Sequence, residues 1–292
     1  MTSSVLPPDT DKSKLFGETI ADIRIPPRPL ILDQIAVEAA RDEPILSTIA
    51  AIISRDVLLS AGMIKLANSP FFGLRVRVKT AHQAVMMLGM ELSIGVITGM
   101  VLRQSFPPGP SMERFWDSSA RIAQVSGWLA ATQFPTLQID SGDAYTFGLF
   151  RDCGIAVLMQ KFKHYQSTLR EANQQSKLKF TDVERMYHPT THTMVGCLMA
   201  RTWWLPEYVT IAIREHHEPE ALMASTSALS HQSRGLIAIA QLAEHIVQTT
   251  HQESSGCEWS KLGAYCLHTL EIDVERVSQL CDATLSIENN EI

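Results

Sequence analysis

Two adjacent histidines in the stretch AIREHHEPE, residues 212–220, are the residues whose types first suggest chemistry. His216 and His217 lie among Glu215, Glu218 and Glu220. Imidazole and carboxylate groups both bind divalent metal ions, so this stretch predicts either a metal site that activates water or the remains of one. Neighbouring residues on a helix point about 100° apart, and the two rings can therefore share one ion only near a helix end.

Further metal-binding residue types are scattered over the second half of the chain: Asp152, His192, His231 and His245. Helical bundles can direct such groups inward from several helices at once. A single histidine on a helix, however, is often an ordinary hydrogen-bonded or exposed residue. The chain has no Walker phosphate loop, no Gly-x-Gly-x-x-Gly, no Gly-x-Ser-x-Gly and no His-Glu-x-x-His. The residues alone therefore leave both interpretations open.

Composition indicates which classes of protein to exclude. The 292 residues are 45% hydrophobic and 19% charged, as in an ordinary folded protein. Because the net charge is -6, we expect no nucleic-acid partner and no attraction to an anionic membrane. The five cysteines form no Cys-x-x-Cys pair, so we expect no disulfide framework, no zinc knuckle and a reducing, cytoplasmic location.

Apolar residues recur at spacings of three and four without an alternating run, which predicts an all-α fold. The run AVMMLGMELSIGVITGMVL, residues 84–102, has nearly the length that crosses a bilayer. Glu91 interrupts it, and a carboxylate is costly in hydrocarbon. We expect one helix to begin after Thr80 and end at Gly89, a second to begin at Met90, and no membrane span.

The positions of proline and glycine residues predict how the chain is divided into lobes. FPPGPS, residues 106–111, cannot continue a helix and is the best boundary between two helical lobes. We predict a flexible tail over residues 1–21, without the order of a signal peptide, and an N-terminal lobe over residues 22–105. Residues 106–292 form a C-terminal lobe with a C-terminal helical extension. In this lobe a helix is expected from Asp140 or Ser141 to residue 162, and Thr181 and Glu184 have the spacing of a capping box.

Several segments together resemble the HD-related output domain family, HDOD. The segments are IPPRPLILDQIAVEAARDEPILSTIAAIISRDVLLSAGMIKLANSPFFG, AHQAVMMLG, FWDSSARIAQVSGWLA, GLFRDCGIAVL, HTMVGCLMARTWWLPEYVTIAIREHHEP and LIAIAQLAEHI. The resemblance covers residues 22–250, and its most specific feature is Asn68-Ser69 before an aromatic residue and Gly73. It implies an all-α fold of two lobes, of which the C-terminal one is similar to the HD superfamily of metal-dependent phosphohydrolases.

The resemblance also implies which residues correspond to the metal ligands of HD enzymes. Four of these positions keep a ligand: Asp152, His192, His216 and His217. Three are substituted: Ser118 stands for the first histidine, Arg151 for the histidine of the His-Asp pair, and Gln241 for the last aspartate. Arg151 is a permanent cation that would pair with Asp152 and oppose a divalent ion. We therefore expect no cofactor and, at these four residues, a weak site for a residual or adventitious divalent metal.

Other features allow a functional and an ordinary interpretation. The Gly-Tyr-Pro signature of cyclic-dinucleotide phosphodiesterases is missing after the twin histidines. A candidate interaction loop contains Asn68, Ser69, Phe71, Phe72, Arg75 and Arg77. Its phenylalanines could anchor a partner from an exposed position, whereas its arginines are better explained as a solvated face than as an anion-binding patch. Trp203, Trp204 and Tyr208 are expected in the core.

The sequence thus favours a bacterial, cytoplasmic signal-transduction module that binds a signalling protein, or a small ligand such as a nucleotide, without catalysis. No receiver, kinase or cyclase domain accompanies it in the chain, so we expect its input from a separate molecule. The alternative is a metal-dependent phosphohydrolase that uses Asp152, His192, His216 and His217.

Overall fold

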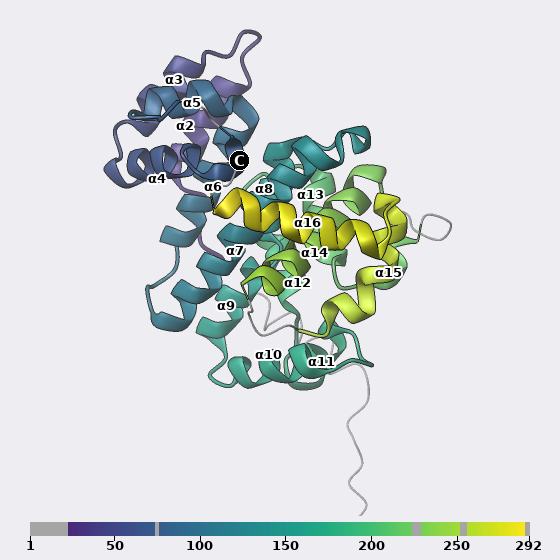
Figure 1. Ribbon diagram of the computed structural model, residues 1–292. Helices are drawn as coiled ribbons and strands as arrows, with labels where there is room; N and C mark the ends of the chain where they lie inside the picture. The colour runs from purple at the N-terminus through teal and green to yellow at the C-terminus, as the bar shows by residue number, and fades with distance from the viewer. Residues whose placement is uncertain (1–22, 74–75, 224–228, 252–255, 290–292) are drawn as a thin grey trace, which may run out of the picture.

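The computed structural model describes residues 23–73, 76–223, 229–251 and 256–289. Within these ranges the chain forms α-helices, short 3₁₀ segments and one π-helical turn, and no strand, which confirms the all-α prediction. The tail predicted over residues 1–21 and Arg75 of the predicted interaction loop lie outside the described residues. Two helical lobes are evident in Figure 1, the N-terminal one in purple and blue.

The N-terminal lobe packs four short helices around a small apolar centre. They are α2 (Leu30–Ala39), α3 (Leu46–Ile53), α4 (Val57–Ala67) and α5 (Ala81–Leu88), with the 3₁₀ turn η1 (Pro70–Phe72) after α4. Asp56 begins α4, because its carboxylate accepts hydrogen bonds from the backbone N–H groups of Leu58 and Leu59 at 2.8 and 3.0 Å. Ile49, Ile53 and Met63 are fully buried between these helices.

The long apolar run is divided between α5 and α6 (Met90–Gln104), as expected. The Thr80 hydroxyl accepts a hydrogen bond from the N–H of Gln83 at 3.1 Å and caps α5. Gly89 ends α5 at a φ of 78°, a left-handed conformation that glycine adopts at little cost. No described helix combines the length and the apolar character that a membrane span requires.

Helix α6 joins the two lobes. It contacts α2, α4 and α5 on one side and α8 (Ser141–Phe150) on the other. Its approach to α8 is close: a Cβ atom on Gly99 would lie 1.9 Å from Cδ2 of Leu149. The interruption after α6 is observed, since α7 begins at Pro110. The division of the chain at residues 105 and 106 stays a prediction, because α6 contacts both lobes.

The C-terminal lobe surrounds the buried helix α14 (His231–Thr250), which has apolar residues on most of its faces. The helices that contact it include α7 (Pro110–Trp128), α8, α13 (Glu207–Glu215) and α15 (Glu258–Leu270). The lobe also contains α9 (Cys153–Lys161), α10 (Tyr165–Gln174), α11 (Phe180–Tyr187) and α12 (His192–Thr202), with the short turns η2 (Leu129–Gln133), η3 (Pro135–Leu137) and η4 (Pro219–Leu222). The last helix, α16 (Val274–Glu288), packs on α14 and reaches η1 near the N-terminal lobe (Figure 1).

Three expectations about local structure are wrong. The helix expected from Asp140 to residue 162 is broken at Arg151 and Asp152, although Asp140 does cap α8 by accepting from Gly142 N–H at 2.7 Å. The capping box is absent, because α11 begins at Phe180 and the Glu184 side chain is fully buried. Trp204 is 71% exposed instead of in the core, whereas Trp203 is buried as predicted.

Candidate metal centre

Helix ends position all four of the predicted ligands. Asp152 lies in the turn between α8 and α9, and His192 is the first residue of α12. His216 is the residue that ends α13, and His217 follows it. The chain leaves helical geometry between the two histidines, so both rings can face one point. This agrees with the expectation that adjacent histidines can share one ion only near a helix end. His192, His216 and His217 are buried, and the Asp152 side chain is 21% exposed.

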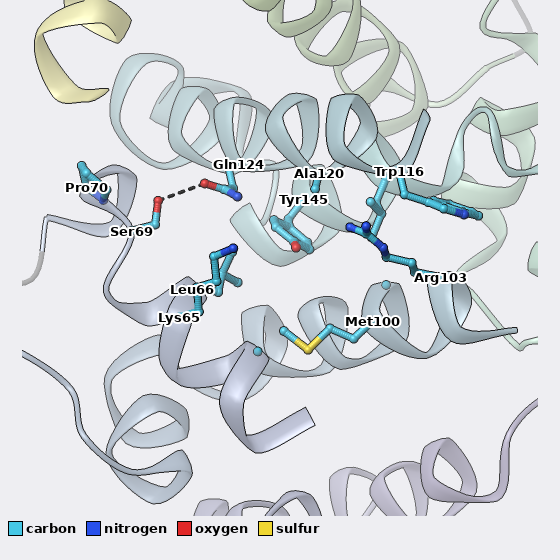
Figure 2. Close-up of a pocket in the computed structure, with 13 residues that line it drawn as sticks. Lys65, Leu66, Ser69, Pro70, Met100, Arg103, Trp116, Ala120, Gln124 and Tyr145 are labelled. Atoms are coloured by element: carbon cyan, nitrogen blue, oxygen red, sulfur yellow. Dashed lines mark hydrogen bonds between the residues drawn. The ribbon is translucent and has the colours of Figure 1, made fainter. Parts of the chain in front are cut away.

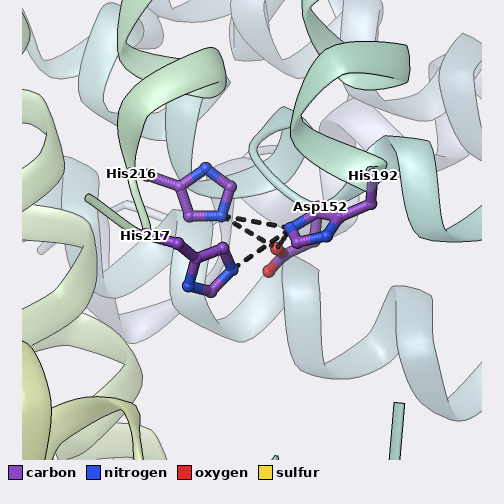
Figure 3. Close-up of side chains that lie close together, drawn as sticks. All are labelled: Asp152, His192, His216 and His217. Carbon is purple, nitrogen blue, oxygen red and sulfur yellow. Dashed lines mark hydrogen bonds and ion pairs between the residues drawn. The ribbon is translucent and has the colours of Figure 1, made fainter. Parts of the chain in front are cut away.

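One atom from each residue meets the others at short range (Figure 3). The four ligand atoms all lie within 4.8 Å of one another. Nε2 of His192 lies 3.2 Å from Nε2 of His217 and 3.5 Å from Nε2 of His216. Oδ1 of Asp152 lies 3.2 Å from Nε2 of His216 and 3.4 Å from Nε2 of His192. Ligands at about 2.0–2.1 Å from one tetrahedral ion would be about 3.4 Å apart, so these four distances fit ligands of a single metal ion.

On the side of each ring that faces away from the cluster, a separate acceptor group contacts the Nδ1 atom. Nδ1 of His216 donates to the Ile213 carbonyl at 2.8 Å. Nδ1 of His192 lies 2.9 Å from a Glu184 carboxylate oxygen, and Nδ1 of His217 lies 2.6 Å from Glu258. Because all three partners are acceptors, each ring carries its proton on Nδ1 and directs the Nε2 lone pair into the cluster.

This arrangement brings three nitrogen lone pairs together and needs a cation among them. Burial lowers the pKa of His192, but the charges of Glu184 and Asp152 outweigh it and raise that pKa to about 10. Burial and the neighbouring His217 lower the pKa of His216 to about 3. A proton on His192 or a metal ion can supply the positive charge. The donor set therefore fits a divalent ion such as Zn²⁺.

The two oxygens of Asp152 face different partners. Oδ1 faces the histidines, whereas Oδ2 lies 3.2 Å from Nε of Arg151. Arg151 is buried, and its other end contacts Glu244 at 2.9 Å. Burial opposes ionisation of Asp152, but Arg151, His192 and His216 lower its pKa well below the usual value. The ion pair and metal ligation are therefore not exclusive, because Asp152 can use one oxygen for each.

A cavity of about 340 Å³ opens beside the cluster. Asp152 and His217 line it, together with Phe180, Arg151 and Glu244. Ser118, the first substituted position, also lines this cavity. Gln241, the last substituted position, is buried on α14, and its Nε2 has no hydrogen-bond partner among the described residues. Three positions later Glu244 binds Arg151, so α14 contributes an ion pair at this cavity.

Sequence reasoning missed the carboxylates that hold the ligands. Glu184 accepts from the backbone N–H of His192 at 3.0 Å and from the Tyr165 hydroxyl, besides its contact with Nδ1. Glu258 is paired with Lys261 as well as with His217, and its pKa is lowered to about 2 because these partners outweigh burial. No local pattern identifies either residue. The sequence signal at Glu184 suggested a helix cap instead.

The predicted interaction loop has mainly structural contacts. The Asn68 amide donates to the Val78 carbonyl and accepts from the Val78 N–H, both at 2.8 Å, and so closes the loop. The Ser69 hydroxyl donates to Gln124 Oε1 of α7 at 2.9 Å. Phe71 and Phe72 are half-buried and pack against the core, Phe71 edge-on to Trp128. The expectation that they form an exposed anchor is wrong, whereas Arg77 is exposed.

Comparison with known proteins agrees with this architecture. The sequence model of the HDOD domain family matches residues 25–219. A protein of Treponema pallidum (strain Nichols) is 28% identical over 206 residues, which cover 69% of this chain and 39% of the relative. The chain thus spans about two fifths of the length of this curated relative.

Solved structures of low sequence identity share the fold. An HDOD domain protein of Geobacter sulfurreducens has a TM-score of 0.69 and 20% identity, with 96% of this chain and 97% of that chain covered. A Shewanella amazonensis protein described as a candidate metal-dependent phosphohydrolase has a TM-score of 0.67 and 15% identity, with 96% and 99% covered. A Marinobacter aquaeolei protein described as a candidate signal transduction protein has a TM-score of 0.66 and 20% identity, with 96% and 63% covered.

The family match includes helices of both lobes and extends through the twin histidines of the metal centre. The chain belongs to the HDOD domain family.

Proposed function

We propose that this chain is a regulatory module of bacterial signal transduction that holds one divalent metal ion and does not hydrolyse phosphate esters. The ion is held by Asp152, His192, His216 and His217, and the module acts by binding a signalling protein or a small ligand. The observation that carries the proposal is the buried Arg151, which lies 3.2 Å from Asp152 on the side away from the histidines.

Arg151 makes a second metal unfavourable. Its guanidinium is permanently charged and contacts both Asp152 and Glu244, so a second divalent ion beside Asp152 would meet a like charge. Ser118 and Gln241 replace two further ligands that the family resemblance assigns. Two-metal phosphoryl chemistry clamps the attacking and leaving oxygens between two ions. The four candidate ligands of this chain form a cluster that could hold one ion.

The similarity to the candidate signal transduction protein of Marinobacter aquaeolei supports a regulatory role. It supports that role through the shared fold alone, because the two sequences are 20% identical. The input signal and the partner are proposed to be separate molecules.

A second function, metal-dependent phosphohydrolysis, is favoured by the cavity of about 340 Å³ into which Asp152 and His217 face. A divalent ion held by the cluster would supply Lewis-acid chemistry and a bound water of lowered pKa. The Shewanella amazonensis protein described as a candidate metal-dependent phosphohydrolase has the same fold. Arg151 and Arg114 also line the cavity and could bind a phosphate group.

Elemental analysis combined with hydrolysis assays separates the two functions. We expect about one transition-metal ion per chain in the wild type, loss of that ion in His216→Ala, and retention in the control His231→Ala, whose histidine is exposed. Aryl phosphates, nucleotides and cyclic dinucleotides should not be turned over. Turnover that disappears in His216→Ala and persists in His231→Ala would establish the hydrolase instead. Failure to bind Zn²⁺, Mn²⁺ or Fe²⁺ would remove the metal from the proposal.

A further inference from the structure

A second cavity lies between the two lobes, and no residue of the metal centre lines it (Figure 2). We call it the interlobe cavity. It has a volume of about 410 Å³, within the range of small-molecule sites. Helices α4 and α6, the turn η1, and α7 and α8 form its walls, with these lining residues: Gly62, Lys65, Leu66, Ser69, Pro70, Gly99, Met100, Arg103, Trp116, Ala120, Gln124, Tyr145 and Leu149.

Two uncharged donors face the interlobe cavity. Tyr145 is 4% exposed, and its hydroxyl points into the open space in Figure 2 without a hydrogen bond to any described residue. Burial raises the pKa of Tyr145, so the phenol keeps its proton. Gln124 uses Oε1 to accept from Ser69 at 2.9 Å, which leaves its Nε2 group to donate toward the cavity. Both donor atoms are open to the cavity, so an acceptor atom of a ligand could take hydrogen bonds from them.

Two cationic side chains also line the interlobe cavity. Lys65 of α4 and Arg103 of α6 direct their charged groups toward the space between the lobes (Figure 2). Lys65 forms no ion pair with a described residue. Arg103 donates from one terminal nitrogen to Asp117 at 2.7 Å, and a guanidinium has five N–H donors, so it keeps others for a ligand. No carboxylate lines the cavity itself, but Asp117 offsets the charge of Arg103 from outside it, so Lys65 supplies the uncompensated positive charge.

The rest of the interlobe cavity is apolar. Its apolar lining consists of Leu66, Met100, Trp116 and Leu149. Ala120 also lines the cavity, and its small side chain leaves the space open. Trp116 is 2% exposed overall, so it is a fixed part of the wall. An apolar wall opposite several donors is the usual composition of a pocket that orients a ligand with one apolar and one anionic part.

We propose that the interlobe cavity binds an organic phosphate of mononucleotide size. The phosphate faces Lys65 and Arg103, the Tyr145 hydroxyl and the Gln124 amide donate to its polar atoms, and the apolar body packs on Met100 and Leu66. The charge of Lys65 and the N–H groups that Arg103 does not use for Asp117 favour a phosphate, with its several acceptor oxygens, over a single carboxylate. The ligand would connect α4 to α7 and α8. It would serve as the input of the regulatory function proposed above, but its binding does not depend on the metal centre.

Binding is tested by calorimetry and thermal shift with AMP, GMP, CMP and UMP as probes. At least one nucleotide should bind saturably, with about tenfold or greater preference over its own nucleoside and over inorganic phosphate. The nucleoside comparison tests the cations, and the phosphate comparison tests the apolar wall. Absence of saturable binding by all four nucleotides would overturn the proposal, as would equal affinity for nucleoside and nucleotide.

Variants locate the bound nucleotide. Lys65→Ala should weaken binding about tenfold, and Tyr145→Phe, which removes one oxygen atom, about fivefold. Ala120→Phe should block the cavity while every donor remains. Lys177→Ala, at an exposed lysine that does not line the cavity, is the matched control and should bind as the wild type does. Unfolding temperatures without nucleotide verify that each variant folds.

The same variants distinguish this site from the metal centre. His216→Ala should lose metal and retain nucleotide binding, whereas Lys65→Ala should retain metal. Nucleotide binding that is lost in His216→Ala and unchanged in Lys65→Ala and Ala120→Phe would place the nucleotide at the metal centre and refute an interlobe site. Failure of the metal proposal would leave nucleotide binding at the interlobe cavity intact.

Discussion

Each histidine of the candidate metal centre is fixed by an acceptor at Nδ1: Glu184, the Ile213 carbonyl or Glu258. These acceptors determine which nitrogen can bind a cation and how the ring is turned. Exchanging one carboxylate therefore alters the metal centre without removing a ligand.

Glu184→Gln is expected to weaken metal binding about 10- to 100-fold, as outer-shell changes commonly do. The amide is neutral and can present an N–H group to the protonated Nδ1 of His192, which disfavours the present ring orientation. Competition with a chelator measures the affinity. Glu171→Gln is the control, because Glu171 is exposed and contacts Tyr187 instead of a ligand. Equal affinities in the two variants would show that Glu184 does not support the centre.

Replacing Arg151 should lower the stability of the fold and raise its affinity for metal. Arg151→Met leaves Asp152 and Glu244 without their cation, and a destabilisation of about 2–4 kcal/mol is expected, since both carboxylates are partly exposed. Metal affinity should increase because the competing charge is gone. Urea denaturation and metal titration measure the two quantities, with Arg55→Met as control, because Arg55 is exposed and does not line the cavity beside the cluster. A variant of unchanged stability would contradict the structural role of this ion pair.

At the residue scale, the sequence identified the four candidate ligands but not the groups that hold them. The family resemblance singled out Asp152, His192, His216 and His217 from a wider set of histidines and carboxylates, and the structure brings these four together. Glu184 and Glu258 lie 8 and 41 positions from their histidines, and nothing local connects them. The pairing of these carboxylates with the histidines depends on how α11 and α15 pack in the fold. No local sequence pattern encodes that packing.

At the scale of elements, the metal centre requires the starts of α9 and α12 to lie against each other, since Asp152 precedes one helix and His192 begins the other. Gly154 allows this contact. A Cβ atom at this position would lie 2.0 Å from the His192 carbonyl oxygen, which is backbone and cannot rotate away.

Gly154→Ala should therefore separate α9 from α12, destabilise the fold by about 1–3 kcal/mol and reduce metal content. Gly109→Ala is a matched control, because nothing lies within 4 Å of a Cβ atom placed there. Thermal unfolding and elemental analysis of the two purified variants measure the effects. Normal metal content in Gly154→Ala would mean that the two helix ends can rearrange without disturbing the ligands.

Elements were predicted well where local signals are strong. Thr80, Gly89 and Asp140 begin or end helices as expected, because capping and left-handed glycine are local properties. The break at Arg151 and Asp152 was missed, since the apolar spacing continues across it. Phe71 was placed in an exposed loop because its packing partner, Trp128, is distant in sequence.

For the whole molecule, apolar spacing predicted the all-α fold class, and the proline-rich stretch at residues 106–111 and the family resemblance predicted two lobes. The cavities between elements could not be predicted. The interlobe cavity takes Lys65 from α4, Arg103 from α6, Gln124 from α7 and Tyr145 from α8. Its shape depends on how the lobes are docked. The Ser69–Gln124 hydrogen bond and the last helix both contribute to that docking.

Helix α16 lies outside the residues that match the family model. It contacts both α14 of the C-terminal lobe and η1 beside the N-terminal lobe, so it should stabilise the interface between the lobes. Ile287, near its C-terminal end, is 7% exposed, whereas Leu285 is 38% exposed. Ile287→Ala should cost about 2–5 kcal/mol and Leu285→Ala less than about 1 kcal/mol. Hydrogen exchange should quicken in α4 and η1 for Ile287→Ala, because loosening α16 releases the turn that holds Ser69. Faster exchange confined to α16 would show instead that this helix covers its own lobe without holding the two lobes together.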